Sequence, residues 1–255
     1  MVISRTSAWL LVAFTLASVL AALLLPAVPQ PLDYHAFADH RTLFGVVNFL
    51  DVASNAAFLL TGATGLLITW LRRAQFGQPA ERLPYTLFFV GVTLTAFGSA
   101  YYHLAPDNER LFWDRLPMAI AFMSLIAAQI SDRISVRAGL ASLAPLLAVG
   151  VASVFYWIHT ERAHEGNVVP YAILQTYAVA VLLLMSLVQP SRYTRGGDIY
   201  WVVAGYAAAK VLELLDRQVL AFGHLISGHT LKHLAAAIAG MVVCRMLWLR
   251  RRIAG

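Results

Sequence analysis

The chain has 255 residues, of which 60% are hydrophobic and only 13% are charged, and its mean hydropathy is +0.69. This composition excludes an ordinary soluble protein and indicates an integral membrane protein. The net charge of +6 does not indicate nucleic-acid binding, because the arginines are spaced along short connections between apolar runs, as membrane topology requires. The single cysteine, Cys244, excludes a disulfide framework and a cysteine-based metal site.

Eight apolar runs are long enough to cross a membrane, since a helix needs about 20 mainly apolar residues to span the hydrocarbon core. Backbone groups in lipid must be satisfied within each run, so we expect helices rather than strands. The sequence therefore predicts an all-α, polytopic transmembrane helix bundle, with a seven-helix core and one additional N-terminal transmembrane helix. The predicted spans lie near residues 7–26, 51–71, 84–104, 113–132, 139–158, 168–188, 199–220 and 229–248.

The chain divides at the proline-rich stretch after the first span. Residues 1–30 are predicted to form an N-terminal transmembrane helix, with a signal-anchor or a signal peptide as the two alternatives. Residues 31–250 are predicted to form the seven-transmembrane core.

Arginines are concentrated in every second connection, which predicts a fixed orientation with both termini in the cytoplasm. We expect the inner membrane of a bacterium as the location. The arginines that carry this prediction are Arg5, Arg72, Arg73, Arg82, Arg133, Arg137, Arg192, Arg195, Arg250, Arg251 and Arg252.

Five polar residues fall at one depth near the outer ends of three predicted helices. Ser99 and His103 are four residues apart and share one helix face, and Asp114 is expected to open the next helix. His229 and His233, in "SGHTLKHLAAA", begin the last helix and lie about 6 Å apart along its axis. The predicted topology therefore gathers all five within one leaflet of the membrane.

Three histidines beside a carboxylate are typical of a catalytic zinc site, in which the fourth position is left for water. Asp114 is then the candidate general base and acid, and the Ser99 hydroxyl the candidate donor to an oxyanion. Taken singly, each residue has a plainer interpretation: a histidine or serine at a helix contact, or Asp114 as a helix anchor or a partner of Arg115. Their convergence favours the metal site, because ionisable groups in a membrane are costly.

The stretches "GSAYYHLAPDNERLFWDRLPMAIAFM" and "SGHTLKHLAAA" carry the pattern S-x3-H-x10-D and a later H-x3-H. This pattern resembles the alkaline ceramidase family, in a wider membrane-hydrolase superfamily that includes adiponectin-receptor-like proteins. The resemblance covers about residues 45–248. It implies a zinc-dependent amidase with His103, His229 and His233 as zinc ligands, Asp114 as acid and base, and Ser99 as oxyanion stabiliser.

The implied reaction is hydrolysis of the N-acyl bond of a ceramide-like lipid to a fatty acid and a sphingoid base or related amine. The implied partners are a lipid amide substrate and the surrounding membrane lipids, in sphingolipid metabolism. With the predicted topology, the active site opens toward the outer leaflet. Two other classes stay open: a non-catalytic receptor or transporter that uses the same polar cluster, and an intramembrane serine protease, although Ser99 lacks the G-x-S-x-G context.

Eukaryotic members of that family have an acidic N-terminal segment that binds calcium. The corresponding region here offers Asp39, Asn48 and Asp51 as oxygen ligands, but Arg41 lies among them and the spacing differs. Calcium takes six to eight oxygen ligands, so this segment has few carboxylates for the task. The alternative is that Asp39 pairs with Arg41 and that Asp51 caps the second helix.

The seventh predicted span carries Lys210, Glu213, Asp216 and Arg217 on an otherwise apolar helix. Their spacings of three and four residues predict a buried ion-pair network. The alternative is that Asp216 orients a zinc-ligating histidine through a hydrogen bond. Lys232, between the paired histidines, is expected to point to another face or outward to the interface.

Overall fold

The structure is a computed structural model that describes residues 3–253, and these residues form helices without any β-strand. Seven of the described helical segments are long and apolar enough to cross a membrane, which confirms the predicted all-α transmembrane bundle. The α-helices are α1 (Arg5–Leu24), α2 (Phe49–Ser54), α3 (Ala56–Leu71), α4 (Arg82–Leu104), α5 (Asn108–Arg133), α6 (Val136–Arg162), α7 (Val169–Val188), α8 (Asp198–Leu214), α9 (Asp216–Gly223) and α10 (Gly228–Leu249). Short 3-10 turns lie at Leu32–His35, Arg73–Gln75 and Pro79–Glu81.

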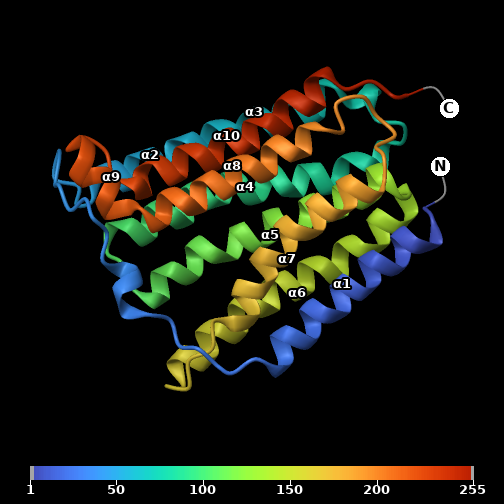
Figure 1. The fold of residues 1–255 in the computed structure, drawn as a ribbon. Coiled ribbons are helices and arrows are strands. Elements are labelled where there is room, and N and C mark those ends of the chain that lie inside the picture. The colour runs from blue at the N-terminus through green and yellow to red at the C-terminus, as the bar shows by residue number, and fades with distance from the viewer. Residues whose placement is uncertain (1–2, 254–255) are drawn as a thin grey trace.

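The helices run side by side along one long axis, and the two chain ends lie at the same end of the bundle (Figure 1). We call this the terminal end. The other end, which holds α2, α9 and the start of α10, is called the α9 end. The connections predicted to be rich in arginine lie at the terminal end, as the alternation along the sequence requires. Which side of a membrane each end faces stays a prediction.

Two predicted spans are interrupted. The span 51–71 is divided at Asn55 into α2 and α3, and the span 199–220 is divided at Leu215 into α8 and α9. Helix α8 has 17 residues and is not among the segments long enough to span a membrane alone. Both breaks lie at the α9 end (Figure 1), where they redirect the backbone beside the start of α10.

Helix α5 begins earlier than expected, so Asp114 does not open it. Asp107 is the N-cap, and its side chain accepts a hydrogen bond from the Arg110 backbone N–H at 2.7 Å, which stabilises the first turn at Asn108. Asp114 therefore lies nearly two turns inside the helix. This places it at the depth of Ser99, which is a similar distance from the end of α4.

Close backbone contact fixes α4 against α5 at this depth. A Cβ atom at Gly98 would overlap the carbonyl oxygen of Trp113, so only glycine permits this approach. The contact brings the segment that carries Ser99 directly against the segment that carries Asp114.

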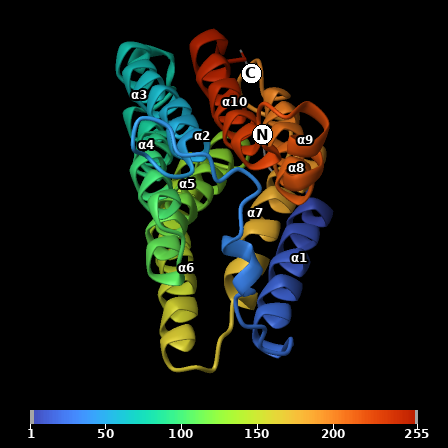
Figure 2. The ribbon, with the colours of Figure 1, turned by 90° about the vertical axis from the view of Figure 1, so that its left-hand side faces the viewer.

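Residues 25–48, which we call the crossing segment, run from the end of α1 across the α9 end to α2 (Figure 2). Helix α1 packs on α7, where Phe14 stacks on Tyr177 with ring centroids 5.7 Å apart and Thr15 hydrogen-bonds the same tyrosine. Helix α1 is therefore an outer helix of the bundle. The crossing segment connects it to the polar residues at the α9 end.

Candidate metal centre

Three histidines from two helices meet at the α9 end. The ring centroid of His103, on α4, lies 4.8 Å from that of His229 and 4.9 Å from that of His233. The two α10 rings are 5.0 Å apart. All three are buried, and one ring nitrogen of each lies within 4.8 Å of the others. The histidine triad predicted from the spacing and topology is thus assembled and can bind a metal ion.

The hydrogen bonding of His103 fits such a role. Its side chain is 1% exposed, and neither Nδ1 nor Nε2 has a hydrogen-bond partner. A buried imidazole without any partner is costly. Metal coordination would satisfy one of these nitrogens, so the donor set of three buried imidazoles fits a zinc ion.

The two α10 histidines are held by neighbours that the sequence did not indicate. Ser54 Oγ, on α2, lies 2.8 Å from His233 Nδ1, which leaves His233 Nε2 for a ligand. Lys232 Nζ lies 3.3 Å from His229 Nε2. The Ser54 hydroxyl can accept from His233 Nδ1 and so orient a ligating imidazole, whereas the Lys232 ammonium only donates and meets the lone pair of His229 Nε2.

The crossing segment covers the triad. The ring of Phe37 lies 4.6 Å from that of His103 and 4.5 Å from that of His229, between centroids. His35 fastens the segment, with Nδ1 2.9 Å from the Tyr102 hydroxyl and Nε2 3.0 Å from Asn108 Oδ1. Burial is the main cause that lowers the pKa of His35, which favours a neutral ring in this contact.

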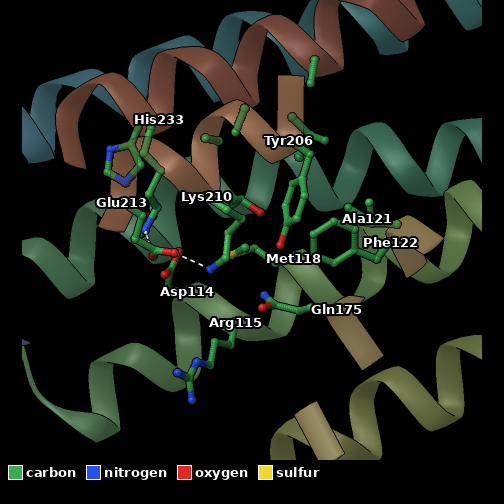
Figure 3. Close-up of a pocket in the computed structure, with 18 of the residues that line it drawn as sticks. Asp114, Arg115, Met118, Ala121, Phe122, Gln175, Tyr206, Lys210, Glu213 and His233 are labelled. Carbon is green, nitrogen blue, oxygen red and sulfur yellow. Dashed lines mark hydrogen bonds and ion pairs between the residues drawn. The ribbon is translucent and has the colours of Figure 1, made fainter. Parts of the chain in front are cut away.

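Asp114, Ser99 and His233 line one cavity of about 350 Å³ inside the bundle (Figure 3). Asp114 is 8% exposed and Ser99 1% exposed. The rest of the wall is mainly apolar and comes chiefly from α3, α4, α5, α7, α8 and α10, including Phe58, Phe88, Val92, Phe122, Leu125, Val179, Leu182, Val202 and Val203. The cavity therefore combines a polar region beside the triad with an extended apolar region.

The ion-pair network predicted on the seventh span is only partly as expected. Lys210 pairs with Glu213 as the spacing predicted, but the second partner of Glu213 is Lys232, with Nζ 2.7 Å from Oε1. The prediction that Lys232 points away was wrong. Lys232 lies three residues after His229, so it shares that helix face and enters the cavity.

Asp216 accepts hydrogen bonds from two backbone N–H groups, that of His229 at 2.7 Å and that of Ala38 at 2.8 Å. It thus holds the first turn of α10 and the crossing segment together. Its contact with His229 is through the main chain rather than through the imidazole ring. Arg217 does not join the network but donates to the Ala36 carbonyl at 3.2 Å.

The candidate calcium ligands are engaged separately. Asp39 pairs with Arg41 at 2.6 and 2.8 Å, and this contact lowers the pKa of the Asp39 carboxyl. Asn48 Nδ2 donates to the His103 carbonyl at 2.9 Å. Within residues 3–253, Asp39 and Asp51 join no group of three or more carboxylate, histidine or cysteine ligands, so calcium binding gains no support.

The alternative prediction that Asp51 caps α2 was wrong, because the N-cap of α2 is Asn48. Asp51 Oδ1 accepts a hydrogen bond from the Thr230 hydroxyl at 2.6 Å, and the Ser227 hydroxyl lies 3.4 Å away. It therefore links α2 to the start of α10, which positions the helix turn that carries His229 and His233.

Comparison with protein-family models gives no match for this sequence, and no curated protein matches it significantly. The functional assignment therefore rests on the residues and their geometry.

Several residues of the centre had no sequence signal. Phe37 and Ser54 belong to no motif in the sequence, and only the tertiary fold brings them to the triad. Asp51 did carry a signal, since an acidic residue in an apolar run is costly unless it has a task. Its carboxylate accepts a hydrogen bond from Thr230 at the start of α10.

Proposed function

We propose that this protein is a membrane-embedded, zinc-dependent amidase that hydrolyses the N-acyl bond of a ceramide-like lipid. The observation that carries the proposal is the buried histidine triad, with both ring nitrogens of His103 unpartnered, of which His233 lines a cavity together with Asp114 and Ser99. The resemblance of the S-x3-H-x10-D and H-x3-H pattern to the alkaline ceramidase family supports the same reaction.

The triad would hold the zinc ion through His103, His229 and His233. A zinc ion there supplies Lewis acidity, which polarises an amide carbonyl and favours ionisation of a water molecule. Ser54 would orient His233, and Asp51 and Asp216 hold the helix turn that carries both α10 histidines.

We assign the proton transfers to Asp114, which lines the same cavity as His233. Its carboxylate accepts a proton from the attacking water as the new C–O bond forms, and returns it to the nitrogen of the leaving amine as the C–N bond breaks. The Ser99 hydroxyl donates a hydrogen bond to the oxygen on which negative charge develops. One amide and one water thus give one carboxylic acid and one amine, and no further reactant is needed.

The cavity wall favours a lipid as the substrate. Its apolar side chains come from six helices, and burying an acyl chain against them is favourable by about 0.8 kcal/mol per methylene. A lipid reaches such a cavity by lateral diffusion in the membrane. This supports a lipid amide rather than a water-soluble amide.

The test uses purified protein in neutral detergent, with zinc content measured by mass spectrometry and release of fatty acid measured from a panel of ceramides. We expect near-stoichiometric zinc and fatty-acid release that is lost in a His229→Ala, His233→Ala variant. Zinc far below stoichiometry, or full hydrolysis by the double variant, would contradict the proposal. Zinc bound without hydrolysis of any lipid amide would favour the receptor or transporter class.

A further inference from the structure

Arg115 is a cation in the cavity wall that the proposed reaction does not use. The two other cations that line the cavity, Lys210 and Lys232, share the carboxylate of Glu213. Among residues 3–253, no carboxylate oxygen lies within 4.0 Å of the Arg115 guanidinium. Arg115 is therefore without a counter-charge in direct contact.

The Arg115 side chain is deeply buried and incompletely hydrogen-bonded. It is 6% exposed. Its Nη2 donates to Gln30 Oε1 at 2.6 Å, whereas its Nη1 is buried and has no partner. A buried charged donor without an acceptor is among the costliest arrangements in a folded protein, so an acceptor is expected at this position.

Aromatic rings hold the guanidinium in place. Its central carbon lies 4.2 Å from the ring centroid of Trp157, 4.9 Å from that of Tyr171 and 5.5 Å from that of Tyr34. Such rings stabilise the cation through their faces, but they do not accept from Nη1 as an anion would. The Trp157 Nε1 is a second buried donor without a partner in this cluster.

The charges of the cavity wall favour an anion. Three cations, Arg115, Lys210 and Lys232, face two carboxylates, Asp114 and Glu213. The wall therefore carries one surplus positive charge before any metal is bound. In the view of Figure 3, Asp114 lies between His233 and Arg115, and the Arg115 side chain extends away from the Lys210–Glu213 pair.

We propose that Arg115 binds the acidic group, a carboxylate or a phosphate, of a lipid that occupies the cavity. A guanidinium offers a planar pair of N–H donors that matches the oxygens of either group. The apolar wall takes the hydrocarbon chain of the same molecule. As a statement about the substrate, this inference rests on the proposed function: the N-acyl lipid that is cleaved carries an acidic group in place of a neutral head.

Binding is tested first, with probes that contain no amide bond and so do not depend on hydrolysis. Purified protein in neutral detergent is titrated with monooleyl phosphate, oleate, oleyl alcohol and inorganic phosphate, and its melting temperature is followed. We expect both acidic lipids to bind at least about tenfold more tightly than oleyl alcohol, because a charge-assisted hydrogen bond is lost in the alcohol. Inorganic phosphate serves to distinguish a free anion from a lipid head group.

Arg115→Gln should bring the affinity for the acidic lipids to within about twofold of that for the alcohol. Two matched controls should keep the preference. Arg250→Gln removes another buried guanidinium that stacks on aromatic rings but does not line the cavity, and Arg110→Gln removes an arginine of the same helix that also lies outside it. If Arg115→Gln does not fold, Arg115→Lys keeps the charge without the paired donors and should reduce the preference.

The binding inference is overturned if wild-type protein binds oleyl alcohol as tightly as monooleyl phosphate, or if neither Arg115 variant changes the ratio. Arg115-dependent protection by inorganic phosphate alone would identify the ligand as a free anion and would overturn the lipid assignment. The substrate statement is then tested with N-oleoylglycine and N-oleoylethanolamine, whose ratio of kcat/KM should fall at least about tenfold in Arg115→Gln. Hydrolysis of ceramides without hydrolysis of N-oleoylglycine would overturn the substrate statement, and hydrolysis of no lipid amide at all would refute the proposed amidase while the binding result stands.

Discussion

The two ends of the bundle both bury charged and polar side chains, but they satisfy them differently. At the terminal end, Arg133 donates to Gln129 Oε1, to the Gln189 carbonyl and to the Gly196 carbonyl, and Asp132 accepts from Ser191. At the α9 end, both ring nitrogens of His103, Asp51 Oδ2 and Arg115 Nη1 have no partner.

Arg250 refines this contrast, because it lies at the terminal end and also has unpartnered donors. It is enclosed by Phe76, Tyr85 and Tyr193 and does not line the cavity. Arg115 has similar aromatic neighbours but lines the cavity. Of the side chains with unpartnered buried atoms among residues 3–253, only Arg115 lines the cavity, so it is the one whose missing partner a ligand in the cavity can supply.

The largest effect is expected from His103→Ala. Removing one of three imidazoles from the triad should release the zinc and bring amide hydrolysis to background, since the metal supplies the Lewis acid. Zinc content and fatty-acid release would be measured on the same preparation. His159→Ala is the matched control, because this exposed histidine of α6 lies outside the triad; equal loss in both variants would show that the triad is not the metal site.

Asp114→Asn is expected to lower kcat by about 10²–10⁴-fold while zinc stays bound, because the amide cannot accept the proton of the attacking water. Asp132→Asn is the matched control on the same helix, buried at the terminal end. It should reduce thermal stability and leave the activity of the folded fraction unchanged. A normal kcat in Asp114→Asn would exclude this residue as the acid and base.

Two close helix contacts, one at Gly98 and one at Gly139, can be compared by changing each glycine to alanine. An added Cβ would overlap the Trp113 carbonyl at Gly98 and Ser131 at Gly139, so each variant should lose about 1–3 kcal/mol of stability by overpacking. Only Gly98→Ala should also reduce hydrolysis per folded molecule, since it displaces Asp114 from Ser99. Melting temperature and single-turnover rate separate these effects, and equal rates in the two variants would refute the positioning role of Gly98.

Asp216→Ala should give the smallest effect. Loss of the acceptor for the His229 and Ala38 backbone N–H groups is expected to cost about 1–2 kcal/mol and to weaken zinc binding by about tenfold. Competition with a chromogenic chelator measures the zinc affinity. An unchanged affinity would limit Asp216 to a role in stability.

The sequence predicted the helices well because each span is a continuous apolar run bounded by proline or polar residues. It missed the breaks at Asn55 and Leu215, because the few polar residues there, Ser54, Asn55, Asp216 and Arg217, lie inside runs that are apolar on both sides. It placed the start of α5 too late because "DNER" reads as a loop, although Asp107 caps the helix. The triad was predicted correctly because helix periodicity and alternating topology together fix the depth of a residue.

What the sequence could not predict is contact across the bundle. Phe37 and Ser54 reach the triad only through the crossing segment and the break between α2 and α3. The inference that Arg115 binds an anion depends on its surroundings: it lines the cavity, three aromatic rings enclose its guanidinium, and no carboxylate pairs with it. None of these follows from its position next to Asp114.

The position of Phe37 has a consequence for biosynthesis. Its ring contacts His103 on α4 and His229 on α10, so the crossing segment, made early in translation, reaches its final place only after the last helix has entered the membrane. A nascent chain that ends before α10 has neither a complete triad nor a closed cover. The three imidazoles therefore come together only once α10 is in place beside α4.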